Sequence, residues 1–306
     1  MRVPIPPASL GDDLVALAGE FADGTREPAE PRNAATVVLI RRGSRAGAGP
    51  DVYLLRRQAS MSFAAGMAVF PGGGVDRRDF DTTVAWAGPS TQRWAEQLGV
   101  AEDLARALVC TAVRETFEES GVLLAGAAED PSHIVADTTG ADWEADRVAL
   151  ESRELAMTDF LNRRGLALRT DLLGVWGAWL TPVFEPRRYR TWFFTAVLPE
   201  GQRTRDVSPE SSSVTWLPAL TAVEQTEAEE LAMMQPTYLT CLEVAQHADP
   251  AAVLAAAEDR TVTMHTPAVV AHDAGEGHTL TLPEHQQPLL AARLAEIGRT
   301  GPGAPA

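Results

Sequence analysis

Lysine is missing from this chain of 306 residues, and all 26 basic residues are arginine. Schiff-base chemistry, including that of pyridoxal phosphate, needs a lysine amine and is therefore excluded. The same absence excludes P-loop NTPases and protein kinases, which hold phosphate groups with a lysine. The 42 acidic side chains leave a net charge of −16. A nucleic-acid partner needs a basic face and is not expected, whereas a small phosphorylated substrate remains open if a metal supplies positive charge.

Cysteine and long apolar runs are also scarce. The only cysteines, Cys110 and Cys241, lie far apart among apolar neighbours, which excludes a disulfide framework and predicts buried thiols. No apolar run approaches the roughly 18 residues that span a bilayer. Residues 1–13 lack the charged start and apolar stretch of a signal peptide. We therefore expect a cytoplasmic protein without a membrane partner.

The remaining composition is that of a globular protein, with 45% hydrophobic residues. Strand-like and helical patterns are mixed without the regular alternation of a doubly wound sheet, which favours an α/β fold of the α+β type. Strands are predicted at 35–41, 52–56, 67–70, 175–180, 191–198 and 214–217. Helices are predicted at 10–21, 91–98, 103–120 and 143–164, with two or three more in 220–257 and a strand pair and a helix in the tail.

The most informative segment reads R-E-T-F-E-E-S-G-V from Arg114 to Val122. At about 100° per residue, Glu115, Glu118 and Glu119 share one wedge of about 100° on a helix. Val109, Val113 and Phe117 form an apolar stripe on roughly the opposite side, and Gly121 suits the left-handed position that ends a helix.

Three carboxylates in one wedge repel one another, and a hard cation reverses that repulsion. Glu115, Glu118 and Glu119 are therefore candidate ligands for Mg²⁺ or Mn²⁺, and Arg114, one turn before Glu118, is expected to brace it. From the helix alone, a solvated acidic face remains the alternative.

Together with the glycines of Phe70-Pro71-Gly72-Gly73-Gly74, this helix resembles the signature of the Nudix hydrolases. That signature is a Gly, a spaced Glu, and then R-E-(apolar)-x-E-E-x-G-(apolar). The second half matches at every charged and Gly position, and Thr116 replaces the apolar residue. The resemblance implies a Nudix fold, with a mixed β-sheet sandwiched between helices.

The first half of the signature departs from the family. Thirteen residues separate Gly from Arg in the family, whereas forty lie between Gly73 and Arg114. We place the surplus at about 75–102, as a helical insertion. Counting back from Arg114, the place of the first Glu is held by Arg106, so that Glu is either lost or moved to Glu102 or Asp103.

A long insertion here is similar to that of the peroxisomal-type coenzyme A diphosphatases, as are Leu54-Leu55-Arg56-Arg57 and Glu185-Pro186-Arg187-Arg188-Tyr189. The predicted organisation is an N-terminal extension (1–32), a Nudix domain (33–247) and a C-terminal extension (248–306) that packs on the domain and has a disordered end.

The resemblance implies a metal-dependent hydrolase of a nucleoside diphosphate derivative, with coenzyme A or acyl-CoA preferred. Another dinucleotide such as ADP-ribose or NADH is one alternative, and a non-catalytic nucleotide-binding regulator is another. The expected partner is the small-molecule diphosphate substrate, and a homodimer is left open.

Candidate catalytic residues are Glu115, Glu118, Glu119, Arg114 and Glu210, the last as an alternative general base. Candidate substrate-binding residues are Arg56, Arg57, Gly72, Gly73, Arg187 and Arg188.

Overall fold

The computed structural model describes residues 10–44, 47–60, 64–130, 132–271 and 277–300. Their largest element is a mixed sheet, in which β1 and β9 run parallel and the other neighbours are antiparallel. Its strand order is β10 (Ser211–Pro218), β2 (Asp51–Arg57), β1 (Arg32–Arg41), β9 (Tyr189–Val197) and β8 (Leu173–Leu180). Two short strands join it, β3 (Ala68–Val69) on β2 and β4 (Gly72–Gly74) on β1.

The central strand β1 shows why the sheet is covered on both faces. Val37 and Leu39 belong to one buried cluster, and Val38 and Ile40 belong to another. Successive side chains of a strand point to opposite faces, so an unbroken apolar run predicts layers on both sides. The expected sandwich of a mixed sheet between helices is confirmed.

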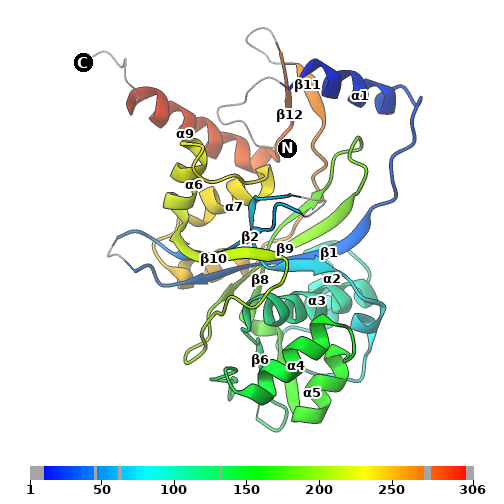
Figure 1. The fold of residues 1–306 in the computed structure, drawn as a ribbon, viewed down its shortest axis with the longest axis vertical. Coiled ribbons are helices and arrows are strands. Elements are labelled where there is room, and N and C mark those ends of the chain that lie inside the picture. The colour runs from blue at the N-terminus through cyan, green and yellow to red at the C-terminus, as the bar shows by residue number, and fades with distance from the viewer. Residues whose placement is uncertain (1–9, 45–46, 61–63, 131, 272–276, 301–306) are drawn as a thin grey trace.

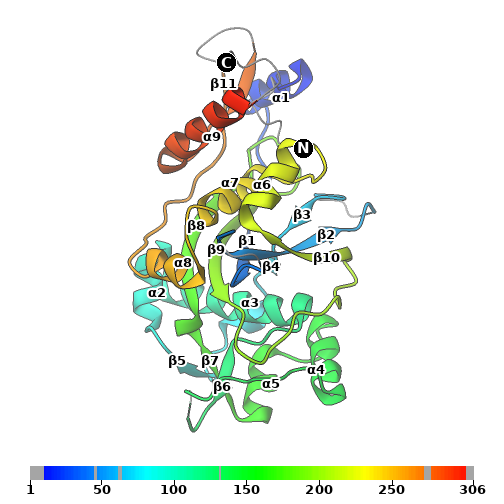
Figure 2. The same ribbon diagram turned by 90° about the vertical axis from the view of Figure 1, so that its left-hand side faces the viewer.

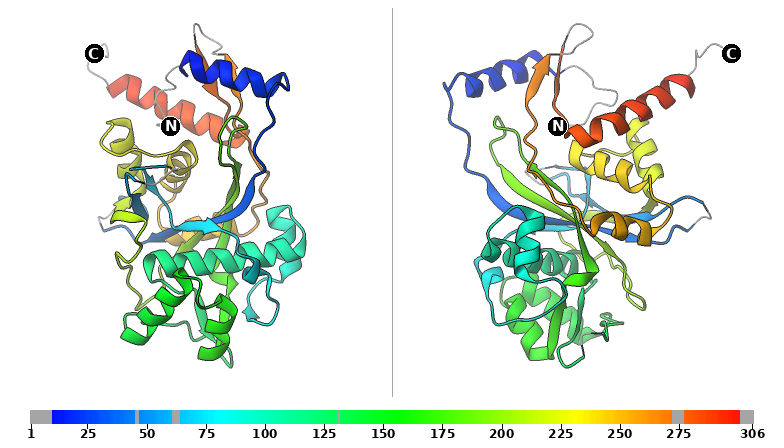
Figure 3. Two further views of the ribbon diagram at one scale, coloured as in Figure 1. Left: turned by 45° about the vertical axis from the view of Figure 1, so that its right-hand side comes forward. Right: turned by 180° about the vertical axis from the view of Figure 1, so that it is seen from behind.

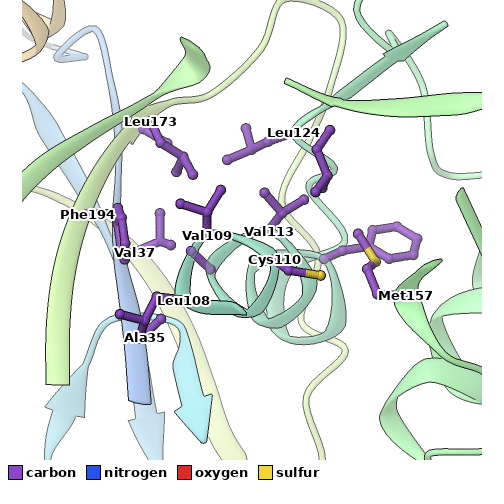
Figure 4. Close-up of a cluster of buried hydrophobic side chains, with 14 of the residues drawn as sticks. Ala35, Val37, Leu108, Val109, Cys110, Val113, Leu124, Met157, Leu173 and Phe194 are labelled. Carbon is purple, nitrogen blue, oxygen red and sulfur yellow. The ribbon is translucent and has the colours of Figure 1, made fainter. Parts of the chain in front are cut away.

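The helices divide between these two faces. Helix α3 (Glu102–Ser120) covers one face, and Figure 4 shows its Leu108 and Val109 beside Ala35 and Val37 of β1 and Phe194 of β9. On the other face lie α6 (Ala219–Glu227), α7 (Gln235–Val244) and α8 (Pro250–Ala257). Figure 2 shows α3 on one side of the sheet and α6 and α7 on the other.

The single helix predicted at 143–164 is two helices, α4 (Ala141–Glu151) and α5 (Met157–Arg164). Between them Arg153 has a φ of 63°, a left-handed conformation that interrupts the helix. Helical periodicity on both sides of the break concealed it.

The insertion at 75–102 is only partly helical, contrary to expectation. It contains the 3₁₀ turn η1 (Arg77–Phe80), strand β5 (Ala85–Ala87) and helix α2 (Thr91–Leu98), in which Trp94 is buried. Strand β5 pairs with β7 (Leu166–Arg169), which pairs with β6 (Ala125–Ala127). A 3₁₀ turn, η2 (Thr170–Leu172), follows β7. The partner of β5 is thus about 80 residues away, beyond the reach of local patterns.

After α8, the C-terminal extension runs along the edge of the sheet. His265 donates its N–H to Ala178 and accepts one from Leu180 of β8, and the Gln97 carbonyl of α2 accepts the N–H of Val262. These bonds satisfy backbone groups that an edge strand would otherwise expose.

Apart from α8, which packs on the sheet, the elements of both extensions lie at one end of the molecule, opposite α4 and α5 (Figures 1 and 3). They are α1 (Asp12–Ala22), β11 (Val269–Ala271) paired with β12 (His278–Leu280), η3 (Glu284–Gln286) and α9 (Gln287–Thr300). Among the described residues no helix is long and apolar enough to cross a membrane. The predicted disordered end, residues 301–306, lies outside the described residues.

Candidate active site

The three glutamates occupy the last two turns of α3 and are largely buried. Glu118 is 8% exposed, Glu119 is 9% exposed and the Glu115 side chain is 12% exposed. Gly121 has a φ of 74° and ends the helix by donating to the Phe117 carbonyl, as predicted. The alternative of a solvated acidic face is therefore wrong. The carboxylates are brought together beneath other parts of the chain.

The glycines of β4 provide this cover. The N–H of Gly72 donates to Glu119 Oε2 at 2.8 Å. A Cβ at Gly73 would lie 2.5 Å from Glu115 Oε1, so only glycine allows the carboxylate to approach this closely. We expected these glycines to approach a diphosphate. Instead the Gly72 amide is already bound to a glutamate, and the two glycines position carboxylates.

Arg114 connects the carboxylates to the rest of the site. Its Nη1 donates to Glu115 Oε1 at 2.6 Å and to Glu118 Oε1 at 3.3 Å, which confirms the expected brace. Its Nη2 also donates to the Gly74 carbonyl at 3.0 Å. The guanidinium thus fixes one oxygen of each of two glutamates.

The principal partner of Arg114 is a residue that the sequence analysis missed. Asp79, at 2% exposure, accepts from Arg114 Nε at 3.1 Å and Nη2 at 2.9 Å, and from the Thr111 hydroxyl at 2.8 Å. Neither expected replacement for the first Glu takes part, because Glu102 accepts from the Thr91 hydroxyl and Asp103 is exposed.

The spacing could have identified Asp79. In the family pattern the Glu follows the Gly by six positions, and six positions after Gly73 is Asp79. Counting forward from the glycine, rather than back from Arg114, places an acid where the pattern has one. The surplus residues therefore follow Asp79 and do not begin at residue 75.

Burial and mutual repulsion shift the titration of the glutamates. Burial raises the pKa of Glu118 to about 7, reinforced by the charge of Glu115. Burial and Glu115 likewise raise the pKa of Glu119 well above its usual value, and burial raises that of Glu115 against the opposing effect of Arg114. The site therefore gathers more carboxyl groups than arginines, and burial without a further cation disfavours their charged forms.

This donor set fits a divalent cation chemically. In the described ranges no group of three or more acidic, His or Cys side chains is arranged so that it could hold a metal ion by itself. Mg²⁺ does not require one, since it binds through one or two carboxylates and substrate phosphates and keeps several waters. Glu115, Glu118 and Glu119 would hold the ion, with Glu119 Oε2 and one oxygen each of Glu115 and Glu118 already oriented by Gly72 and Arg114.

Two further charged residues border the carboxylates. Arg57, at the end of β2, lowers the pKa of Glu119, and Glu210, which precedes β10, raises it; both are secondary to burial. Arg57 Nη2 and Glu210 Oε2 form an ion pair at 3.0 Å. Glu151 of α4, bound to Arg147 at 3.3 Å, was not predicted and is close enough to Glu210 for their charges to interact.

Two other predicted substrate-binding arginines have different surroundings. Arg56 alternates with Arg57 along β2 and shares the face of Leu54, away from α3, with its Nε donating to the Gly66 carbonyl. Arg188 is 7% exposed and donates to the carbonyls of Thr181 and Ala29. Arg188 is therefore not free to bind phosphate as predicted, whereas Arg56 is exposed and stays a candidate. Arg187 is exposed, and its role stays a prediction.

The fold and this site define a Nudix protein. The crystal structure of a Nudix hydrolase from Alicyclobacillus acidocaldarius is similar, with a TM-score of 0.61 and 26% identity, covering 77% of this chain and 99% of that one. The NUDT19 Nudix domain model matches residues 87–242, just over half of the chain, and the chain belongs to this family.

Two named relatives extend the comparison. The chain is 26% identical over 221 residues to "Acyl-coenzyme A diphosphatase NUDT19" of Xenopus laevis, covering 61% of this chain and 58% of that protein. It is 24% identical over 210 residues to "Putative nudix hydrolase 7" of Caenorhabditis elegans, covering 67% and 57%. The chain thus spans little more than half the length of these curated relatives.

Proposed function

We propose that this protein is a metal-dependent hydrolase that cleaves the diphosphate bond of a nucleoside diphosphate derivative, with coenzyme A or acyl-CoA as substrate. The observation that carries the proposal is the buried cluster of Glu115, Glu118 and Glu119, whose pKa values are raised by burial and mutual repulsion. The similarity to a relative named as an acyl-CoA diphosphatase supports this choice of substrate.

In the proposed reaction, water attacks one phosphorus and the bond from that phosphorus to the bridging oxygen breaks. The bridging oxygen leaves with the other phosphoryl group. The products of coenzyme A are adenosine 3′,5′-bisphosphate and 4′-phosphopantetheine, or the acylated form of the latter. Bound Mg²⁺ or Mn²⁺ supplies positive charge that neutralises the diphosphate and acidifies a water molecule.

The chain's own residues supply the positioning. Arg114 and Gly72 hold the carboxylates of the metal-binding set in place. Arg57 is the arginine outside that set whose charge acts on Glu119, and we assign it to a phosphate oxygen. Glu210 Oε2 is the proposed acceptor for the proton that the attacking water releases.

A substrate panel tests the proposal. Coenzyme A, acyl-CoA, ADP-ribose, NADH and diadenosine polyphosphates would each be incubated with Mg²⁺ or Mn²⁺, and the products separated by mass. We expect coenzyme A or acyl-CoA to have the highest kcat/KM. A higher kcat/KM for ADP-ribose or NADH would transfer the assignment to another dinucleotide, and binding without turnover of any substrate would establish a regulator.

A further inference from the structure

The ion pair between Arg57 and Glu210 is incompletely bonded compared with the Arg114 centre. The Arg57 side chain is 17% exposed, and its Nε is buried without a hydrogen-bond partner among the described residues. The Glu210 side chain is 52% exposed. A buried guanidinium N–H without an acceptor is costly, so Arg57 has an unused donor beside the carboxylate cluster.

The backbone around Glu210 is fixed, in contrast to its side chain. The Gln58 N–H donates to the Glu210 carbonyl at 2.9 Å, and the Gln58 side chain donates to the Pro209 carbonyl. Ser211 next to it pairs with Arg57 in the register of β10 and β2. The carboxylate can therefore leave Arg57 by rotation of its own side chain, without movement of the strand or loop.

From this geometry we propose that Glu210 occupies the place on Arg57 that a substrate phosphate takes, so that the ion pair is exchanged when the diphosphate binds. Two oxygens of one phosphate group offer Arg57 the acceptor that Nε lacks and a replacement for Glu210 on Nη2, in the bidentate geometry that guanidinium groups prefer. The displaced Glu210 carboxylate is then free to accept a proton.

This inference rests on the proposed function and adds an order of events to it. In the free protein, Arg57 and Glu210 neutralise each other, and neither can perform its assigned role. Diphosphate binding separates them and enables both. Because the Glu210 carboxylate is half exposed, the ion pair contributes little stability, and its exchange for a phosphate costs little free energy.

The test measures binding of α,β-methylene-ADP, a diphosphate whose P–C–P bond is not hydrolysed, in the presence of Mg²⁺ by calorimetry. Because Gln carries no charge to compete for Arg57, Glu210→Gln is expected to tighten binding by about 3- to 10-fold. Arg57→Ala is expected to weaken it by at least about 10-fold. In the Arg57→Ala background, Glu210→Gln is expected to change the affinity by less than about 2-fold.

Glu151→Gln is the matched control for net charge, since Glu151 also lies near the cluster but pairs with Arg147. If Glu210→Gln tightens binding equally with and without Arg57, or no more than Glu151→Gln does, the effect is general repulsion and the exchange is wrong. Unchanged or weaker binding in Glu210→Gln also overturns it, as does failure of the wild type to bind the analogue. Binding with the expected pattern, but without turnover on the substrate panel, would reject only the proposed hydrolase function.

Discussion

Arg114 and Arg188 are similar in sequence context and in burial, and they differ in what surrounds them. Each lies in an arginine-containing motif predicted to be functional, and the two are 8% and 7% exposed. Arg114 donates to the carboxylates of Asp79, Glu115 and Glu118. Arg188 donates to the backbone carbonyls of Thr181 and Ala29, and so ties the N-terminal segment to β8 and β9.

The difference shows that burial and charge alone do not define a site for phosphate chemistry. Around Arg114 the carboxylates outnumber the arginine, and the surplus negative charge favours a cation. Around Arg188 there is no carboxylate surplus, because the guanidinium is bound to neutral carbonyls. The residues that accept the arginine's hydrogen bonds distinguish a reactive centre from a structural support.

The largest expected effect is loss of turnover at the Arg114 centre. Replacing Glu118 and Glu119 together with Gln removes two carboxylates from the proposed metal-binding set and should lower kcat for coenzyme A by at least about 10³-fold. Initial rates at saturating Mg²⁺ or Mn²⁺ measure the change. Glu102→Gln, in the first turn of the same helix, is the control and should retain wild-type kcat. Full activity in the double variant would reject the metal site.

The next effect is on stability, and it compares Asp79 with Asp103, one of the two acids first considered as the first Glu of the signature. Asp79→Ala leaves a buried guanidinium with fewer partners and should reduce the free energy of unfolding by about 3 kcal/mol. Asp103→Ala, at an exposed position of α3, should change it by less than about 0.5 kcal/mol. Urea unfolding followed by circular dichroism distinguishes the two. Equal stabilities would mean that Asp79 does not support Arg114.

A smaller effect is expected from Arg188. Arg188→Ala removes two hydrogen bonds from a charged donor and should cost about 2 kcal/mol of stability in the same unfolding assay. The ratio of kcat/KM for coenzyme A to that for dephospho-CoA, which lacks the 3′-phosphate, should remain that of the wild type. A ratio that falls toward one would show that Arg188 binds the 3′-phosphate. Arg188 would then be a substrate-binding residue and not only a structural one.

The smallest effect concerns pH in chelator-treated protein. Burial raises the pKa of Glu118 from its usual 4.5 to about 7 in the folded protein. The folded state therefore binds the extra proton more tightly, and stability falls as pH rises from about 4.5 through 7. We expect a decrease of about 1 kcal/mol between pH 6 and pH 7, which thermal unfolding at these two pH values would detect. Glu118→Gln should flatten this dependence, and an equally steep slope in that variant would assign it to another group.

Local sequence patterns predicted much of the fold. Helix 91–98 was predicted with its observed bounds, and the strands at 35–41 and 52–56 extend only a few residues further. The break at Arg153 and the pairing of β5 with β7 were missed, because they depend on a single backbone dihedral and on a strand about 80 residues away.

The sequence by itself determined that Glu115, Glu118 and Glu119 share a helix face and that Gly121 ends that helix, since both follow from a period of 3.6 residues. It also specified, through the spacing from Gly73, that an acid stands at position 79. Only the tertiary structure decided that this face is buried, that Gly72 donates to Glu119, and that Asp79 holds Arg114. Those contacts join segments 35 to 47 residues apart, and their energies depend on burial. The periodicity of a helix gives no information on which of its faces other segments will bury.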